Sequence, residues 1–295
     1  MKNSYVIKYV LLLISLLLIP SCKFFHDEKA HPLNGEQTAR LISKFYSELG
    51  PRIGAHLVDP NVVITIAGLR GHGNFLMHNL TSDEKLKLEK INETSQKSGI
   101  KFILHDDPTD ELSDISIINF KGMENTSKLS RLSFITPFDS STGYEGFLSW
   151  LKESRHKAES YFQDKASFHK EALDHLIIGL ERGYPDQALL DLYNAYLKYT
   201  DFPKNIFNLF KLTRIPYSDF YDNAQPNFHY LAEHENEKSI AATKQTWGDL
   251  LTDFYNAPWH KAIANDPGFV KIRASEDKEH NDWFKQTVLN KPNPS

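Results

Sequence analysis

The chain has 295 residues, with 34 lysines and arginines against 38 aspartates and glutamates, and 40% of its residues are hydrophobic. This length suits one large domain or two small ones, and it suffices to bury a core without a disulfide or metal. The mildly acidic charge balance argues against the strong positive field of a nucleic-acid-binding protein. A single cysteine excludes an internal disulfide and any zinc site built from several cysteines.

The first 21 residues have the pattern of a secretory signal peptide. Lys2 and Lys8 precede the apolar run 10–19, which is shorter than the roughly 20 residues that a spanning helix needs. The run leads into Ile19-Pro20-Ser21-Cys22, and Cys22 is the only cysteine of the chain. This segment resembles the lipobox of bacterial lipoproteins. The alternative is an ordinary cleaved signal peptide with a chance cysteine.

The lipobox resemblance implies that Cys22 is lipidated and becomes the new N-terminus. Several acyl chains on one cysteine hold a protein stably on a bilayer, whereas one chain is marginal. The resemblance implies a place in the bacterial cell envelope with the body facing the periplasm, and Lys23 after the cysteine favours the outer membrane over the inner one. Residues 22–35 are short, mostly polar and contain Pro32, so we interpret them as a tether.

Residues 36–137 are predicted to be rich in strands. Helical spacing of apolar residues predicts a helix over 36–49, and a capping box, Thr81 to Glu84, predicts a second helix that Gly99 ends. The β-branched run 61–67 and the segment 100–104 are predicted as strands on either side of that second helix. Strand, helix and strand in this order predict a βαβ unit with parallel strands and a right-handed crossover.

Further strands are expected over 115–120 and 132–136, running antiparallel, with Val58 or 228–230 as an extra edge. After Pro137 the periodicity is helical, with a helix–helix elbow at Gly183-Tyr184-Pro185 and a last helix over 240–254.

We therefore predict an α+β fold in which a small mixed sheet is packed by a helical C-terminal half. The body is assigned to 36–277, sheet-rich to residue 137 and helical from 138, and 278–295 is assigned as a polar tail.

The segment Gly68–Asn74 is the first candidate site. It follows a predicted strand and begins a long loop, and ligands of parallel α/β units bind at the carboxyl ends of strands. Gly71 and Gly73 would let the backbone approach a ligand, Arg70 would clamp an anion, and His72 would exchange protons near neutral pH. The alternative is a tight irregular loop whose glycines serve only its conformation.

The strand at 100–104 would end at the same edge of the sheet, bringing His105, Asp106 and Asp107 to that segment. The two carboxylates and the imidazole suit general acid–base work, whereas the alternative for Asp106-Asp107-Pro108 is a turn. A second candidate is the aromatic loop 215–226, in which turn residues would place Tyr217, Phe220 and Tyr221 at the surface as ligand-binding residues.

Other chemistry has little support in the sequence. The nucleophile elbow, phosphate-loop, dinucleotide-binding and zinc-protease patterns are absent, so we expect no metal and no cofactor. The first functional hypothesis is a lipid-anchored envelope protein whose soluble body binds an envelope protein or a small ligand, without nucleic acid. The alternative hypothesis is an anchored hydrolase or transferase that uses Gly68–Asn74 together with His105–Asp107.

Overall fold

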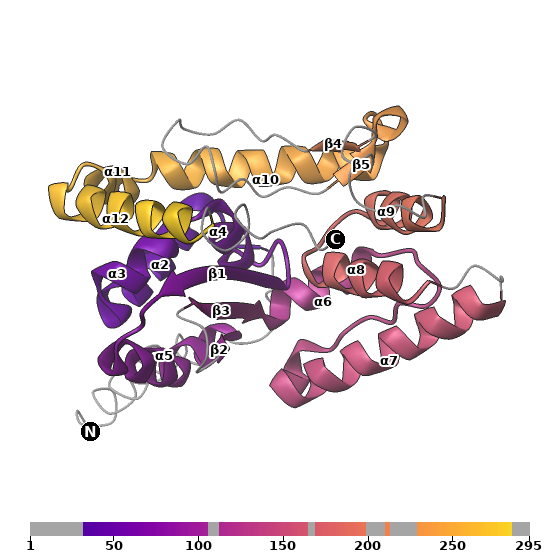
Figure 1. The fold of residues 1–295 in the computed structure, drawn as a ribbon, viewed down its shortest axis with the longest axis horizontal. Helices are drawn as coiled ribbons and strands as arrows, with labels where there is room; N and C mark the ends of the chain where they lie inside the picture. Colours follow the sequence, from indigo (N-terminus) through magenta and orange to yellow (C-terminus); the bar gives the residue numbers. More distant parts are fainter. Residues whose placement is uncertain (1–31, 106–111, 165–168, 199–209, 213–228, 285–295) are drawn as a thin grey trace, which may run out of the picture. The chain divides into compact units, whose positions relative to one another are not determined.

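A computed structural model of the chain describes residues 32–105, 112–164, 169–198, 210–212 and 229–284 (Figure 1). The predicted signal peptide, Cys22 and most of the tether lie outside these ranges. Pro32–Ser295 group in one compact unit. Within the described ranges, no helix combines the length and the apolar character that crossing a bilayer would require.

The N-terminal part alternates helices with three strands. Its elements are α2 (Gly35–Leu49), α3 (Pro51–His56), α4 (Pro60–Ile66), β1 (His72–His78), α5 (Ser82–Ser95), the 3-10 turn η1 (Gln96–Ser98), β2 (Ile100–His105), β3 (Leu112–Asn119) and α6 (Phe120–Leu129). From residue 140 the described elements are almost all helical. They are η2 (Ser140–Thr142), α7 (Gly143–Asp164), α8 (Lys170–Glu181), α9 (Asp186–Lys198), β4 (Phe210–Leu212), β5 (His229–Leu231), η5 (Ala232–His234), α10 (Lys238–Asn256), α11 (Pro258–Ala264) and α12 (Pro267–Phe284).

The three N-terminal strands form a sheet in the order β1-β3-β2. β3 runs antiparallel to both neighbours, with His72 opposite Ile118 on one side and Ile103 opposite Ser116 on the other. The α+β class is confirmed, but the prediction of a mixed sheet with neighbouring parallel strands is wrong. β1, α5 and β2 do form a strand–helix–strand unit whose strands run the same way, yet β3 lies between them.

The run Asn61–Ala67, predicted as a strand, belongs to helix α4. Pro60 occupies the first turn, where its fixed φ suits a helix start. Val62, Val63, Ile64 and Ile66 are all at most 1% exposed. A helix buried on every side has the same continuous apolar pattern as a buried strand, so burial here overrides β-propensity.

The residues predicted as a long loop contain β1 instead. Apolar Phe75 and Met77 alternate with His72, Asn74 and His78, which is the period of a strand. The prediction of a strand over 132–136 is also wrong: this segment is irregular, and Phe134 and Ile135 are buried in the helical half. These apolar side chains and a hydrogen bond from Trp150 Nε1 to the Thr136 carbonyl at 2.7 Å hold the segment in place without strand pairing.

The predictions are confirmed for helix ends that are marked by capping residues or glycine. Thr81 and Glu84 cap α5 reciprocally, with Glu84 accepting from the Thr81 backbone at 2.9 Å. Gly99 follows in the left-handed region with φ of 69°. Gly183, with φ of 67°, makes the elbow between α8 and α9. These positions were predictable because the signal is carried by a few adjacent residues.

Two further predictions need correction. The polar tail was placed from Lys278 onward, but α12 continues to Phe284, because its apolar positions pack on α3 and β1. Tyr230 does not extend the main sheet: β5 pairs with β4 in a separate two-stranded sheet. Val58 is fully buried and lies between α3 and α4.

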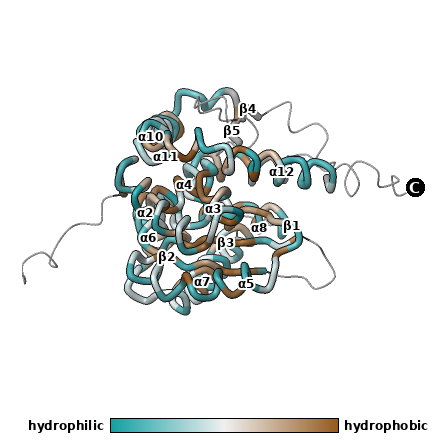
Figure 2. Tube along the Cα trace, turned by 90° about the vertical axis from the view of Figure 1, so that its left-hand side faces the viewer, coloured by the Kyte–Doolittle hydropathy of each residue, from teal (hydrophilic) through white to brown (hydrophobic). Residues whose placement is uncertain are grey.

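The two faces of the main sheet differ. Phe75, Met77, Ile115 and Ile117 point into a core shared with α2, α4 and α10. Ile118 on the other face joins a second core built by α6, α7 and α8. Figure 2 colours the chain by hydropathy and shows hydrophobic residues on β3 and hydrophilic ones along α12. The second face also carries His72, Asn74, Asp114 and Ser116 and is therefore the polar one.

Candidate functional site

The polar face of the sheet brings three chemically complementary side chains together. His72 opens β1, Ser116 lies near the middle of β3, and Glu181 ends α8. His72 Nε2 lies 3.2 Å from Ser116 Oγ, and His72 Nδ1 lies 3.2 Å from Glu181 Oε2. One imidazole thus stands between a hydroxyl and a carboxylate.

Strand pairing accounts for the contact between His72 and Ser116. His72 is opposite Ile118, so Ser116 is its diagonal neighbour on the same face of the antiparallel pair. Diagonal neighbours lie within reach of long and aromatic side chains. Asn74 is directly opposite Ser116, and Ile103 flanks Ser116 from β2.

Glu181 reaches the sheet because the end of α8 docks on the entry to β1. Its backbone carbonyl accepts from the Gly71 N–H at 3.1 Å. A Cβ on Gly71 would lie 2.3 Å from Met123 Cε and 3.0 Å from Met123 Cα, so only glycine allows α6 this close. The approach of α8 to Gly71 brings the Glu181 carboxylate to the imidazole.

The site is largely withdrawn from water but not sealed. The side chains of His72 and Glu181 are 19% and 14% exposed, and Ser116 is 6% exposed. His72 Nδ1 is close enough to the Glu181 carboxylate for an ion pair, but the two groups are not aligned for a hydrogen bond. Catalytic hydrogen bonds are often poorly aligned before substrate binds.

Asn74 and Asp114 lie beside Ser116 on the same face. The Asn74 side chain donates from Nδ2 to Asp114 Oδ1 at 3.0 Å. This bond uses one of the two amide N–H groups and fixes the plane of the amide. The amide has a second N–H group, and Asn74 is the residue directly opposite Ser116 in the strand pair.

Arg70, predicted as an anion clamp, is instead buried beneath the strand. It is 3% exposed, donates from Nε to the His72 carbonyl at 2.7 Å, and bonds Asn61 Oδ1 at 3.0 Å. Its guanidinium carbon lies 6.0 Å from the ring centre of Trp247. Burial lowers its pKa to about 10, so Arg70 stays charged at neutral pH and supports the backbone of His72.

Gly71 and Gly73, predicted as ligand-binding residues, serve packing in this structure. A Cβ on Gly73 would lie 2.4 Å from Thr65 Oγ1 of α4. Together with the contact of Gly71 to Met123, this places β1 tightly against two helices. The alternative of a tight irregular loop does not account for these two glycines, because Gly73 lies in β1 and neither glycine has a positive φ; both are needed for the close approach of the helices.

The predicted meeting of His72 with the segment after 100–104 depended on parallel neighbouring strands, which the sheet lacks. His105 is opposite Asp114, four residues along β3 from the partner of His72. Four residues span about 13 Å of strand, so the two imidazoles lie towards opposite ends of the sheet. Asp106 and Asp107 lie outside the described residues, as do Tyr217, Phe220 and Tyr221.

Ser116 and Glu181 were missed by reasoning from the sequence. Ser116 was hidden inside an apolar run, although its alternation with Ile115 and Ile117 marks it as facing the other side. Glu181 carries no local signal, because its contact with His72 arises from packing between residues more than 100 positions apart.

A second imidazole–carboxylate pair joins His234 of η5 to Asp191 of α9. His234 Nδ1 is 2.8 Å from Asp191 Oδ1, and this hydrogen bond raises the pKa of His234. Asp191 also accepts the Leu231 N–H at 2.9 Å. The pair therefore fastens β5 and η5 to α9.

Within the same ranges, no group of three or more histidine, cysteine, aspartate or glutamate side chains is arranged to hold a metal ion. Comparisons of the chain with models of protein families, with curated proteins and with solved structures return no match.

Proposed function

We propose that this protein is a lipid-anchored enzyme of the bacterial envelope that hydrolyses or transfers acyl groups with Ser116 as the nucleophile. The observation that carries the proposal is the placement of the His72 imidazole, with Nε2 toward Ser116 Oγ and Nδ1 toward Glu181. A serine activated by a base, with the base oriented by a third group, is the arrangement that nucleophilic acyl transfer needs.

The side chains have distinct roles in the proposed reaction. Ser116 Oγ attacks the carbonyl carbon of the substrate while its proton moves to His72 Nε2. The bond between the carbonyl carbon and the leaving group then breaks, and the imidazolium, stabilised by Glu181, gives its proton to the leaving group while the acyl group stays bonded to Ser116 Oγ. Water, or another acceptor, next loses a proton to His72 and attacks the acyl carbon; the bond to Ser116 Oγ breaks, and His72 returns the proton to Ser116.

Labelling with a fluorophosphonate probe tests this proposal, because such probes phosphonylate activated serines. We expect a labelled peptide that contains Ser116, no labelling of Ser116→Ala, and labelling slowed by roughly 10²–10⁴-fold in His72→Gln. Ser113→Ala is the matched control, since Ser113 lies on the same strand but on the opposite face. A folded wild-type protein that the probe leaves unlabelled contradicts the proposal.

The anchor part of the proposal rests on Cys22 and the lipobox-like segment before it. Metabolic labelling with a radioactive fatty acid is expected to mark the wild-type protein and not Cys22→Ala. Fractionation of the labelled cells then distinguishes the outer membrane from the inner one. A wild-type protein that carries no label would remove the anchor.

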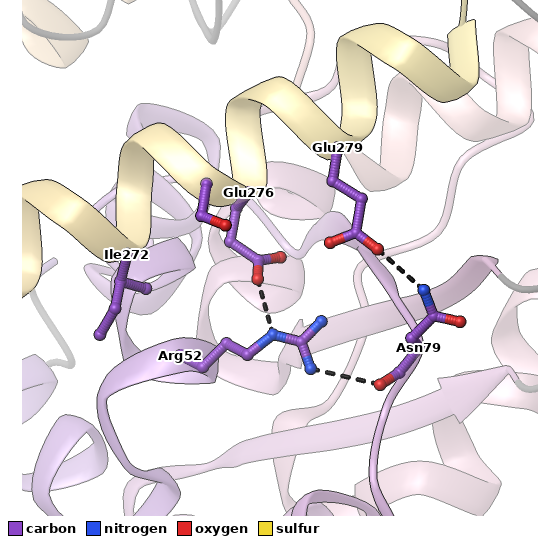
Figure 3. A pocket seen from close by; sticks show the side chains of 6 residues that line it. Arg52, Asn79, Ile272, Glu276 and Glu279 are labelled. Carbon is purple, nitrogen blue, oxygen red and sulfur yellow. Dashed lines mark hydrogen bonds and ion pairs between the residues drawn. The ribbon is translucent and has the colours of Figure 1, made fainter.

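A second candidate function is binding of a small ligand or an envelope partner without chemistry. It is favoured by a cavity of about 340 Å³ between α12 and the residues around Arg52 and Asn79 (Figure 3). In this case a ligand found by thermal-shift screening would still stabilise Ser116→Ala and would fail to stabilise Ser275→Trp, whose side chain fills the cavity.

A further inference from the structure

Helix α12 is joined to the rest of the body by ion pairs withdrawn from water. Arg273 lies 2.8 Å from Asp59 Oδ1, and Glu276 lies 2.6 Å from Arg52 Nε. The Arg273, Asp59 and Glu276 side chains are 11%, 12% and 7% exposed. Pairs this buried are screened little by salt, and removing one partner leaves an uncompensated charge.

These pairs belong to a cluster whose charges do not balance by themselves. Arg52 also pairs with Glu84 of α5 at 3.1 Å. Three carboxylates, those of Asp59, Glu84 and Glu276, therefore face two guanidinium groups. One further positive charge is needed to make this cluster neutral, and a buried net charge is costly.

His56 occupies the place where that charge is needed. Its Nδ1 lies 3.5 Å from Asp59 and its Nε2 lies 3.5 Å from Glu276. The ring is stacked on Phe75, with 5.1 Å between centroids, which fixes its orientation. Only the protonated imidazole has a donor on both nitrogens, one for each carboxylate.

The two carboxylates beside His56 both favour its protonated form. Burial by itself lowers the pKa of His56, but its hydrogen bonds to Asp59 and Glu276 outweigh burial and the opposing charge of Arg273, so the pKa is raised.

Farther out, Asp277 lies 3.7 Å from Arg273, and Glu279 adds another carboxylate near Arg52. His78 and His280 also flank the cluster, and burial followed by the charge on His78 lowers the pKa of His280. His280 thus favours the neutral form, and His56 is left to supply the missing charge.

The same helix forms one wall of the cavity. Ile272, Ser275, Glu276 and Glu279 of α12 line it on one side, and Arg52 and Asn79 line it on the other. Figure 3 shows Arg52 reaching Glu276 across this space and Glu279 reaching Asn79, whose Nδ2 donates to the carboxylate at 2.8 Å. Lifting α12 would open the cavity.

We propose that α12 is a proton-dependent latch, closed over this cavity when the imidazole of His56 is protonated and loosened when the proton is lost. The stabilisation is fully present below the ordinary histidine pKa of about 6.5 and is lost as the pH rises through the raised pKa of folded His56. The latch is independent of the chemistry proposed at Ser116.

Hydrogen exchange measured by mass spectrometry on the full chain tests the latch. After correction for the intrinsic pH dependence of exchange, peptides from α12 should exchange several-fold faster at pH 8.5 than at pH 6.0. Peptides from α8, remote from His56, should change little and serve as the internal control. Equal protection of α12 at the two pH values would overturn the proposal.

Two substitutions separate the latch from a general effect of pH. His56→Gln cannot take up the proton and should give α12 the same rapid exchange at both pH values. Glu276→Gln removes one carboxylate, so the cluster is balanced with neutral His56 and the difference between the pH values should disappear. His156→Gln, at an exposed position of α7, is the matched control and should keep the wild-type response.

If His56→Gln does not fold, Glu276→Gln and the wild-type comparison still decide the question. A wild-type pH response in either variant would contradict the role of His56.

Discussion

At the scale of single residues, the polar face of β1 and β3 gathers several polar side chains around Ser116. His72 approaches Ser116 along a diagonal of the strand pair, and Asn74 stands directly opposite it. Asp114 holds the Asn74 amide, and Arg70 holds the His72 backbone from beneath.

Asn74 is predicted to donate a hydrogen bond to the oxyanion that forms when Ser116 attacks. Asn74→Ala should slow reaction with the fluorophosphonate probe by about 10²–10³-fold, the usual effect of losing one such donor, while Ser116 remains the labelled residue. The measurement is the second-order rate of labelling. Leu76→Ala, two residues along β1 on the same face, is the control, and an equal loss in both variants would indicate a merely structural effect.

The site residues differ in how far the sequence predicts them. His72 was singled out because an imidazole near glycines is a plausible proton carrier, and it does contact a hydroxyl and a carboxylate. Its partners were not predictable, because strand register and the docking of α8 decide them. For Arg70 the sequence was misleading. Its positive charge suggested that it binds an anionic ligand, but the side chain is buried, and this burial can be seen only in the structure.

At the scale of elements, close helix packing positions the site. A Cβ on Gly122 of α6 would lie 2.2 Å from the Arg70 carbonyl oxygen, a backbone atom that cannot move aside cheaply. This contact holds the turn before β1 against α6, and the carbonyl of Glu181 completes the same junction through Gly71.

Gly122→Ala is therefore expected to lower the free energy of unfolding by about 1–3 kcal/mol, the range for overpacking a tight interface. Urea denaturation measures this change. Lys121→Ala, at the exposed neighbouring position, should change stability by less than about 0.5 kcal/mol. Equal stability of Gly122→Ala and the wild-type protein would show that α6 and the turn separate without cost.

Elements were predictable where their ends are marked locally, as at the Thr81 cap and the Gly183 elbow. They were not predictable where burial decides. The sequence of α4 has the same continuous apolar run as a buried strand. Because this run was predicted as a strand, the sheet was also wrongly predicted to contain neighbouring parallel strands. β1 was overlooked because glycine and polar residues masked its alternation.

At the scale of the whole molecule, two buried histidines respond to pH in opposite ways. His260 packs against the rings of Phe254 and Tyr255, and burial lowers its pKa to about 4. His260 is neutral in the folded protein at neutral pH. In acid the unfolded chain binds a proton at this histidine more readily than the folded chain does, so acid favours unfolding. The pKa of His56 is raised, so its contribution to the stability of the fold grows as the pH falls and reaches its full size below about pH 6.5.

Stability should consequently be greatest near pH 6.5. Between pH 6.5 and 4, His260 alone should reduce the free energy of unfolding by about 3 kcal/mol. Urea denaturation across this range measures the loss, and His260→Gln should flatten it, whereas His156→Gln should not. The lowered pKa values of Asp59 and Glu276 add a further loss at the acid end, where these carboxylates become protonated.

The contact of α2 with α10 joins Gly35 to Phe254, two positions more than 200 residues apart in the sequence. A Cβ on Gly35 would lie 2.4 Å from the Phe254 backbone nitrogen, so the two helices touch at main-chain distance. A nascent polypeptide leaves the ribosome with its amino end first, and α2 then waits for some 200 residues of synthesis before its partner exists. During that interval the part of α2 that α10 will cover has no partner, whereas the parts that pack on α3 and α5 find theirs early. A truncated product without α10 would leave that part of α2 uncovered.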